Sequence, residues 1–168
     1  MTAPTANELV YTGEEQALVD EGTAAGGTMM YSTSQNGTYS ATIPTGKDAK
    51  QYSVWYKVVG DDNHTDTEPV EIKVTISPMN ITDNNPTITL GNTLTYTGAE
   101  QTQTVSGVTC NGLTVTYTVS NNKGTNAGGY TLTVTGTGNF TGTATENFSI
   151  SKKPVTGTNQ TLLVKTEY

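Results

Sequence analysis

Hydrophobic and polar residues alternate in several short stretches of the chain. The stretch 52–58 shows this clearly, because apolar side chains occupy every second position. Successive side chains of a strand point to opposite faces, so this period predicts strands with one packed face and one solvent-facing face. The same alternation recurs at 29–33, 72–76, 113–119 and 130–134. The predicted fold class is therefore all-β, with antiparallel sheets.

The chain also contains one unit written twice. Four stretches recur in the same order, and the offset between the copies shrinks from 85 to 74 residues along the chain. A duplicated unit of this kind has to be recognised before the fold is assigned. The recurring pairs are 9–16 with 94–101, 48–54 with 126–132, 60–64 with 136–140, and 74–77 with 148–151.

These observations predict two tandem immunoglobulin-like antiparallel β-sandwich modules, at residues 1–78 and 79–153. Five to seven short strands in about 75 residues, separated by Gly and Asn turns, are typical of a small sandwich. We expect residues 154–168 to be a tail or the start of a further module, with one more strand at 161–164.

The joint between the modules is expected to be a short linker bounded by Pro78 and Pro86, which favours restricted rotation. Proline lacks the backbone donor that a sheet ladder needs, and it biases the residue before it towards extended geometry. Within the joint, Asp83 and Asn84 favour an Asx turn over an interdomain calcium.

Charge and composition exclude several classes of partner. The formal net charge is −7, arginine is absent, and the eight lysines are scattered. Nucleic acid and anionic membranes both attract clustered cations, so neither is an expected partner. No stretch approaches the roughly 20 apolar residues of a membrane span, and residues 1–4 lack the start of a signal peptide. If the protein is exported, we expect this chain to be a fragment of it, without signal or anchor.

Two tyrosines predict a structural corner. Residues 48–54 read Asp-Ala-Lys-Gln-Tyr-Ser-Val, and residues 126–132 read Asn-Ala-Gly-Gly-Tyr-Thr-Leu. Both resemble the Asp-Ala-Gly-x-Tyr run of immunoglobulin-like domains, in which the tyrosine hydroxyl bonds back to the backbone. The resemblance implies this role for Tyr52 and Tyr130. Val54 and Leu132 stand where antibody domains place a disulfide cysteine, so apolar packing replaces the crosslink there.

A longer pattern points to a family. It consists of Tyr-Thr-Gly-x-Glu-Gln at 11–16, Gly-Gly-Thr-Met-Met-Tyr-Ser at 26–32, the run at 48–52, and Gly-Asp-Asp-Asn-His at 60–64. This pattern resembles the MBG-type immunoglobulin-like repeats of large bacterial surface proteins. The resemblance covers nearly all of residues 6–152, and the second copy departs from it by its shorter middle. It implies an extracellular location at the bacterial cell surface and a stalk of tandem modules, and it transfers no catalytic or ligand residue.

Clustered oxygen donors suit calcium, which makes Asp61, Asp62 and Asp66 the candidate metal ligands. An EF-hand loop beginning at Asp61 would need Gly at its sixth position and Glu at its twelfth. The chain has Asp and Ile there, and the second copy has no acid at this bend. We therefore expect a turn with solvated side chains, with no metal and no cofactor. His64 stands where the second copy has Phe140, which favours a packing or turn role.

Trp55 is the candidate ligand contact. Alternation puts it opposite the apolar face, where the second copy has Thr133, and exposed large aromatics mark contact sites. The alternative is that Trp55 covers an edge strand or packs under a neighbouring loop. Cys110 is the only cysteine, and we expect it to fill space at the edge of a core.

Acidic residues do not predict an enzyme. Adjacent acids such as those at 14–15 diverge on a strand, whereas a glycosidase needs two carboxylates that converge across a cleft. The pairs Glu15–Gln16 and Glu100–Gln101 recur in the two copies, so we expect them to bond the backbone near Gly13 and Gly98.

The leading hypothesis is a non-catalytic spacer or stalk segment of a large, secreted, adhesin-like bacterial cell-surface protein. We expect an elongated monomer about 70–80 Å long, whose partners are the neighbouring repeat modules of the same chain. The alternative is an adhesin module that binds a host glycan or host protein through exposed aromatics around Trp55.

Overall fold

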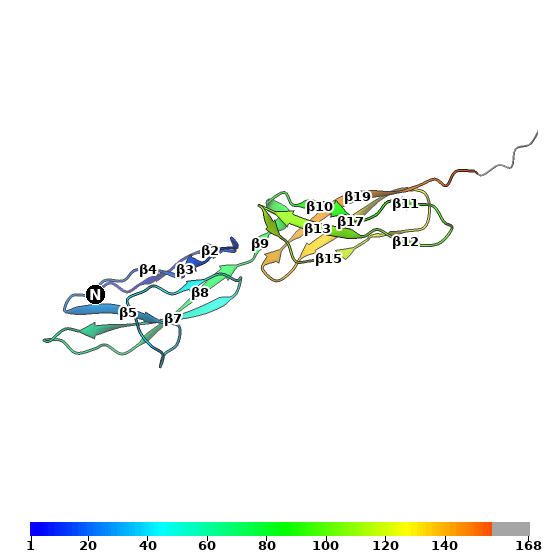
Figure 1. Cartoon of the computed structure of the whole chain (residues 1–168). Coiled ribbons are helices and arrows are strands. Elements are labelled where there is room, and N and C mark those ends of the chain that lie inside the picture. Colours follow the sequence, from blue (N-terminus) through cyan, green and yellow to red (C-terminus); the bar gives the residue numbers. More distant parts are fainter. Residues whose placement is uncertain (156–168) are drawn as a thin grey trace, which may run out of the picture.

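The structure is a computed structural model that describes residues 1–155 and consists almost entirely of strands. The predicted all-β fold class is confirmed. An N-terminal half (residues 1–78) and a C-terminal half (residues 79–155) lie end to end, with the N-terminus near the outer end of the first half (Figure 1). The strand expected at 161–164 lies outside the described residues, as does the tail beyond residue 155.

Eight strands form the N-terminal half: β1 (Thr5–Ala6), β2 (Leu9–Val10), β3 (Gln16–Ala17), β4 (Val19–Asp20), β5 (Gly27–Ser32), β6 (Thr45–Gly46), β7 (Gln51–Gly60) and β8 (Val70–Ser77). The main sheet has the order β2-β8-β7-β5. β7 pairs antiparallel with both β5 and β8, whereas β2 runs parallel to β8, with Leu9 opposite Ile76. The pairs β1–β4 and β3–β6 lie across the core from this sheet.

The C-terminal half repeats this arrangement. Its elements are β9 (Met79–Asn80), the 3₁₀-helix η1 (Ile81–Asp83), β10 (Thr87–Leu90), β11 (Leu94–Thr95), β12 (Gln101–Thr102), β13 (Val105–Cys110), β14 (Leu113–Thr114), β15 (Tyr117–Ser120), β16 (Lys123–Gly124), β17 (Gly128–Gly136), β18 (Phe140–Thr141) and β19 (Thr143–Ser151). The main sheet has the order β11-β19-β17-β15, and the facing sheet has the order β10-β13-β14. As in the first half, the outermost pair, β11 with β19, is parallel.

Each half has its own hydrophobic core, built by the alternation that the sequence predicts. Val54, Tyr56 and Val58 are buried along β7, while Trp55 and Lys57 between them are half-exposed. Val54 and Leu132, at which apolar packing is predicted to replace a disulfide, are both fully buried. The first core consists of Leu18, Val19, Met29, Tyr31, Val54, Tyr56, Val58, Val74 and Ile76, and the second of Met79, Ile81, Leu94, Val108, Cys110, Val115, Leu132, Val134, Phe140, Phe148 and Ile150.

The stretch 113–119 departs from a single strand. β14 pairs with β13 in one sheet, and β15 pairs with β17 in the other. The chain crosses the core between them, with Val115 buried at the crossing. A period of two cannot reveal this switch, because side chains at every second position still point into the same core from either sheet.

Candidate functional site

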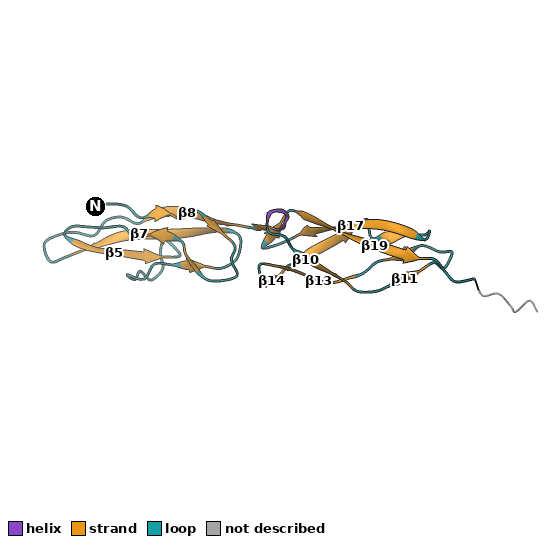
Figure 2. Ribbon diagram, turned by 90° about the horizontal axis from the view of Figure 1, so that it is seen from above, coloured by secondary structure: helices purple, strands orange, loops and turns teal. Residues whose placement is uncertain are grey.

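The segment that follows Pro78 belongs to the core of the C-terminal half. Met79 is buried and Ile81 is 0% exposed. β9 pairs in parallel with β18, and the Met79 amide donates to the Asn139 carbonyl at 3.0 Å. The prediction of a linker here is wrong, because Met79 and Ile81 of this segment are buried as part of the second core. In Figure 2, η1 lies at the junction of the two halves.

Side chains of this segment secure its path. The Asn80 Oδ1 atom accepts from the Thr82 amide at 3.1 Å, and its Nδ2 atom donates to Asp83 at 2.6 Å. The Thr82 hydroxyl donates to the carbonyl of Thr143 and accepts from its amide, each at 2.9 Å. The Asn84 side chain donates to the Asn80 carbonyl at 2.8 Å. The Asx-type cap of this segment is therefore formed by Asn80, three residues before the position at which the sequence predicts an Asx turn.

Tyr11 connects the two cores. Its amide donates to the Ser77 carbonyl at 2.8 Å, which places the residue just after β2 at the end of the first half. Its ring meets the Phe140 ring edge to face, with centroids 5.4 Å apart and an interplanar angle of 79°. The Tyr11 side chain packs against both hydrophobic clusters. Edge-to-face pairs of this kind add about 1 kcal/mol beyond the area that they bury.

A second contact across the joint is polar. The Asn139 Oδ1 atom accepts from the Ala49 amide at 2.7 Å, and its Nδ2 atom donates to the Asp48 carboxylate at 3.1 Å. The Tyr52 hydroxyl donates to the Asp48 carbonyl at 2.9 Å, so this tyrosine holds the loop that Asn139 engages. A side chain bonded at both ends of its amide group fixes the rotation of one half against the other better than apolar contact alone.

Gly13 allows the close approach of the two halves. Its φ of +81° lies in the left-handed region, and a Cβ atom added to it would stand 2.7 Å from Leu113 of the other half. Its counterpart Gly98 has a φ of +87° but is exposed. A Cβ atom added to Gly98 would have its nearest neighbour, the Tyr96 hydroxyl, 3.9 Å away. Turn geometry therefore explains glycine at both positions, and packing explains it additionally at Gly13.

The glutamines and the glutamate Glu100 beside these glycines, which were expected to bond the backbone, make different contacts. The Gln16 side chain donates to the Val10 carbonyl at 3.1 Å, and the Gln101 side chain donates to the Thr95 carbonyl at 3.0 Å, which confirms the glutamine prediction. Glu100 instead forms an exposed ion pair with Lys123 at 3.0 Å. The predicted backbone role of Glu100 is wrong.

Tyr130 occupies the corner of the C-terminal half. Its hydroxyl donates to the Asn126 carbonyl at 2.7 Å and accepts from the Asn126 amide at 3.2 Å. Its ring stacks on Phe148, with centroids 5.3 Å apart. Tyr52 and Tyr130 thus make the same backbone bond, one at the joint and one at the outer end of the C-terminal half.

The acidic turn after β7 is held by its own carboxylates. Asp61 accepts from the Asn63 amide at 2.9 Å and from the His64 Nδ1 atom at 2.6 Å. Asp66 accepts from the Gly60 amide at 3.0 Å and pairs with Lys57 at 3.2 Å. In the described part of the chain, no three His, Cys, Asp or Glu side chains come together as a metal site.

These contacts shift the acidity of the turn. The hydrogen bond from His64, followed by that from the Asn63 amide, lowers the pKa of Asp61 below its usual 3.8. The Gly60 amide bond, followed by the Lys57 side chain, lowers the pKa of Asp66. Asp62, the third candidate ligand, is exposed beside them. The turn lies at the outer end of the N-terminal half, away from the joint (Figure 1).

Trp55 lies on the outward face of the main sheet. β7 is flanked by β8 and β5, and Trp55 stands between Ser32 and Glu71 in the register. Trp55 is half-buried. On the same strand, the Lys57 ammonium lies 5.3 Å from the centroid of the Tyr39 ring, so the 33–39 loop approaches this face.

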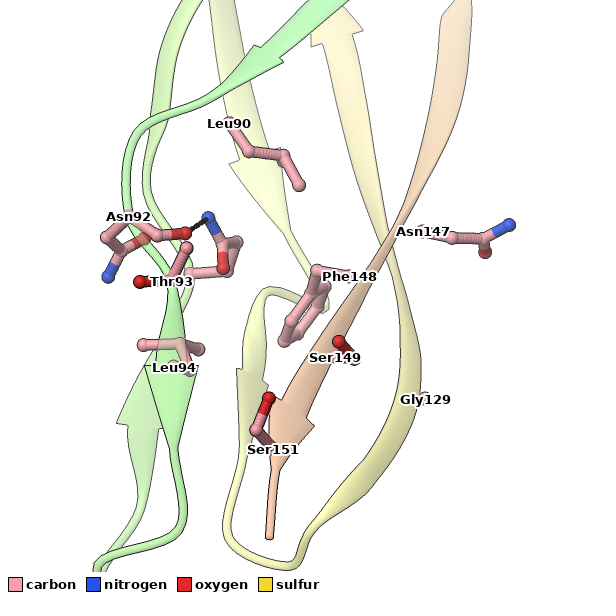
Figure 3. Close-up of a pocket in the computed structure, with 10 residues that line it drawn as sticks. Leu90, Asn92, Thr93, Leu94, Gly129, Asn147, Phe148, Ser149 and Ser151 are labelled. Carbon is pink, nitrogen blue, oxygen red and sulfur yellow. Dashed lines mark hydrogen bonds between the residues drawn. The ribbon is translucent and has the colours of Figure 1, made fainter. Parts of the chain in front are cut away.

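A groove of about 500 Å³ opens between the two sheets of the C-terminal half. Figure 3 shows Leu90 and Leu94 on one wall and Phe148 on the other, with the Asn147 side chain turned away. The buried Gln103 side chain also lines the groove and donates to the Asn92 carbonyl at 2.9 Å. The described residues that line the groove include no Asp, Glu, His, Cys or Lys. It therefore offers no acid, base or cysteine nucleophile for catalysis.

Cys110 is buried within the second core, where the sequence predicts a space-filling thiol at a core edge. Burial raises the pKa of the Cys110 thiol. Reactive cysteines have a lowered pKa and an accessible sulfur, so this environment suits an inert side chain.

No family model, curated protein or solved structure matches the chain. Among the described residues, the structure contains no helix that is long and apolar enough to cross a membrane.

Sequence reasoning missed the residues that form the joint. Tyr11, Gly13 and Asn139 each recur in both copies of the unit, as Tyr96, Gly98 and Asn63. That recurrence was the available signal, because a residue kept in both copies at a turn can serve the contact between copies.

Proposed function

We propose that the chain is a non-catalytic spacer segment in the stalk of a bacterial cell-surface protein of the adhesin type, built from two tandem immunoglobulin-like modules divided at residues 78 and 79. The joint carries this proposal. Tyr11 with Phe140, and Asn139 with Asp48 and Ala49, tie the halves together by apolar and polar contacts. The pairing of β9 with β18 builds the segment after Pro78 into the second half. A stalk needs modules held at a fixed angle, and these contacts supply one.

Two further features support a role without chemistry. The groove of the C-terminal half is lined by residues that lack an acid–base group, and the carboxylates of Asp61 and Asp66 are engaged by donors of their own turn. The extracellular setting rests on the resemblance to MBG-type repeats. An acidic surface without arginine agrees with a protein that avoids nucleic acid and anionic lipid.

Small-angle X-ray scattering on the chain tests the proposal. A spacer of two modules end to end predicts a monomer about 70–80 Å long, estimated from strand rise and loop lengths. The pair-distance distribution should show the extended profile of a two-lobed rod. A compact profile, with the two halves packed side by side, would contradict a stalk segment.

The second candidate function is binding of a host glycan or host protein through Trp55. The half-buried indole on the outward face of β7, near Tyr39 and Lys57, favours it, because aromatic faces stack on sugars and anchor protein contacts. A glycan and host-protein panel, probed with the chain and with Trp55→Ala, tests it. Binding that Trp55→Ala abolishes and the matched Thr133→Ala retains supports the adhesin function. A panel without binding contradicts it and leaves the spacer.

A further inference from the structure

The outer end of the C-terminal half carries a shallow hollow of about 380 Å³. Tyr96, Asn126, Ala127, Lys152 and Lys153 line it. They come from three separate segments, after β11, before β17 and after β19, which the fold gathers at one end of the molecule. The hollow is therefore a product of tertiary structure.

Each of these segments has a counterpart that forms the joint. Tyr96 corresponds to Tyr11, and its amide donates to the Ser151 carbonyl at 2.9 Å as the Tyr11 amide does to Ser77. Asn126 and Ala127 correspond to Asp48 and Ala49, the residues that hold Asn139. The Tyr130 hydroxyl fixes this loop through the Asn126 carbonyl, as the Tyr52 hydroxyl fixes its counterpart. The outer end thus presents the same backbone donor, a side-chain acceptor and the same aromatic ring.

The two ends differ in what covers them. Ile81, four residues after Ser77, is 0% exposed in the second core, whereas Val155, four residues after Ser151, is 96% exposed. The Tyr96 side chain is 38% exposed, while Tyr11 packs against two cores. An isolated apolar side chain on a surface is ordinary, but here the exposed Tyr96 and Val155 match a half-buried Tyr11 and a buried Ile81 at the joint.

We propose that this outer surface docks a further module of the same repeat, joined head to tail in the same chain through Lys152–Val155. The Ala127 amide donates to an incoming asparagine, the Asn126 side chain accepts from it, and the Tyr96 ring receives the aromatic residue that follows. Val155 enters the core of the added module as Ile81 enters the second core. Lys153 takes the place of buried Met79, with its methylene stem packed and its ammonium group in water.

This inference rests on the proposed function, and a lengthened chain tests it. Residues 1–155 are followed directly by a copy of residues 82–155, so that Lys153–Val155 open the added module. We expect amide hydrogen exchange at Ala127 to slow at least tenfold relative to the 1–168 chain. In the lengthened chain, Val155→Ala should lower the melting temperature of the added module by about 4–8 °C. In the 1–168 chain the same substitution should leave melting unchanged, because the side chain is exposed.

Three results would overturn the inference. The first is that the added module folds, but Ala127 exchanges at its original rate and Val155→Ala does not change the melting temperature. The second is that the 1–168 chain itself shows concentration-dependent protection of Ala127, which would assign the surface to a second copy of the chain. If the added module does not fold, a second chain, residues 1–152 followed by a copy of 79–155, restores Met79–Ile81. Protection of Ala127 in that chain supports the docking surface and removes Lys153–Val155 from it, and failure of both chains overturns the proposal.

Failure here is distinguishable from failure of the spacer function. The Ala49 amide reports the joint that already exists, since it donates to Asn139 in the 1–168 chain. Slow exchange at Ala49 with fast exchange at Ala127 in the lengthened chain overturns docking and retains the spacer. Fast exchange at Ala49 in the 1–168 chain contradicts the fixed joint itself.

Discussion

The turn at 60–64 and its copy at 136–140 have the same backbone form and different surroundings. The His64 amide donates to the Asp61 carbonyl, and the Phe140 amide donates to the Thr137 carbonyl, each at 3.1 Å. The first turn lies at the outer end of the molecule and is closed by Asp61. The second lies at the joint, where Phe140 is 4% exposed and Asn139 binds the other half.

The difference shows how a repeated unit adapts to its position. The backbone of the turn is set by the unit, because Gly60 and Gly136 both bring their chains close to the residues that follow, including His64 and Thr141. The side chains follow the neighbourhood. The turn in water is held by charge and hydrogen bonds, and the turn against the other half of the molecule is held by an aromatic ring and a neutral amide.

The largest expected effect comes from truncating the aromatic residue of each turn. Phe140→Ala removes a buried ring from the second core and from its contact with Tyr11, so it should lower the free energy of unfolding by about 3–5 kcal/mol. His64→Ala, at an exposed position, should change it by less than about 1 kcal/mol. Denaturant unfolding measures both. Equal losses would contradict the assignment of the second turn to the joint.

The asparagine that precedes each aromatic residue gives a smaller contrast. Asn139→Ala removes the bonds to Asp48 and Ala49, and each such bond contributes about 1 kcal/mol net. We expect a loss of about 1–2 kcal/mol together with faster amide exchange at Ala49. Asn63→Ala is the matched control and should leave Ala49 unchanged. An Ala49 amide that stays protected in Asn139→Ala would show that Asn139 does not hold the Asp48–Ala49 loop.

Acid should affect the first turn through a carboxylate of the turn itself, and this is the smallest effect. The lowered pKa of Asp61 means that its carboxylate stabilises the fold above the unfolded value of 3.8, and that this contribution is lost as the pH falls through the lower folded value. The turn at 136–140 has no carboxylate. Amide shifts of Asn63 should titrate below pH 3.8. Asp61→Asn should abolish the titration of Asn63, and a titration that persists would assign it to another group.

Local pattern predicted what local chemistry determines. Val54 and Leu132 are buried because alternation on a strand fixes the face of each side chain, and the Tyr52 bond spans only four residues. The joint could not be predicted in this way. The stretch 78–86 is rich in Asn, Asp and Pro and has the composition of a linker, yet Ile81 is buried because a second sheet happens to receive it.

The sequence pattern did not predict the switch of sheet between β14 and β15, or the role of Asn139, for the same reason. Both depend on which surface a segment meets, and alternation is blind to the choice between two sheets that share a core. Asparagine is also common at turns throughout the chain, so composition did not single out Asn139. For Trp55, sequence predicted the outward face, and the burial along β7 agrees.

The proposed spacer requires a fixed joint between the two halves, and a distance distribution measured across the joint tests this. Nitroxide labels at Lys73→Cys on β8 and Thr145→Cys on β19, both exposed, in a Cys110→Ala background report one distance between the halves by electron paramagnetic resonance. We predict a single narrow distribution that broadens when Asn139→Ala is added. A broad distribution in the chain without Asn139→Ala would show that the halves rotate freely and would contradict a fixed joint.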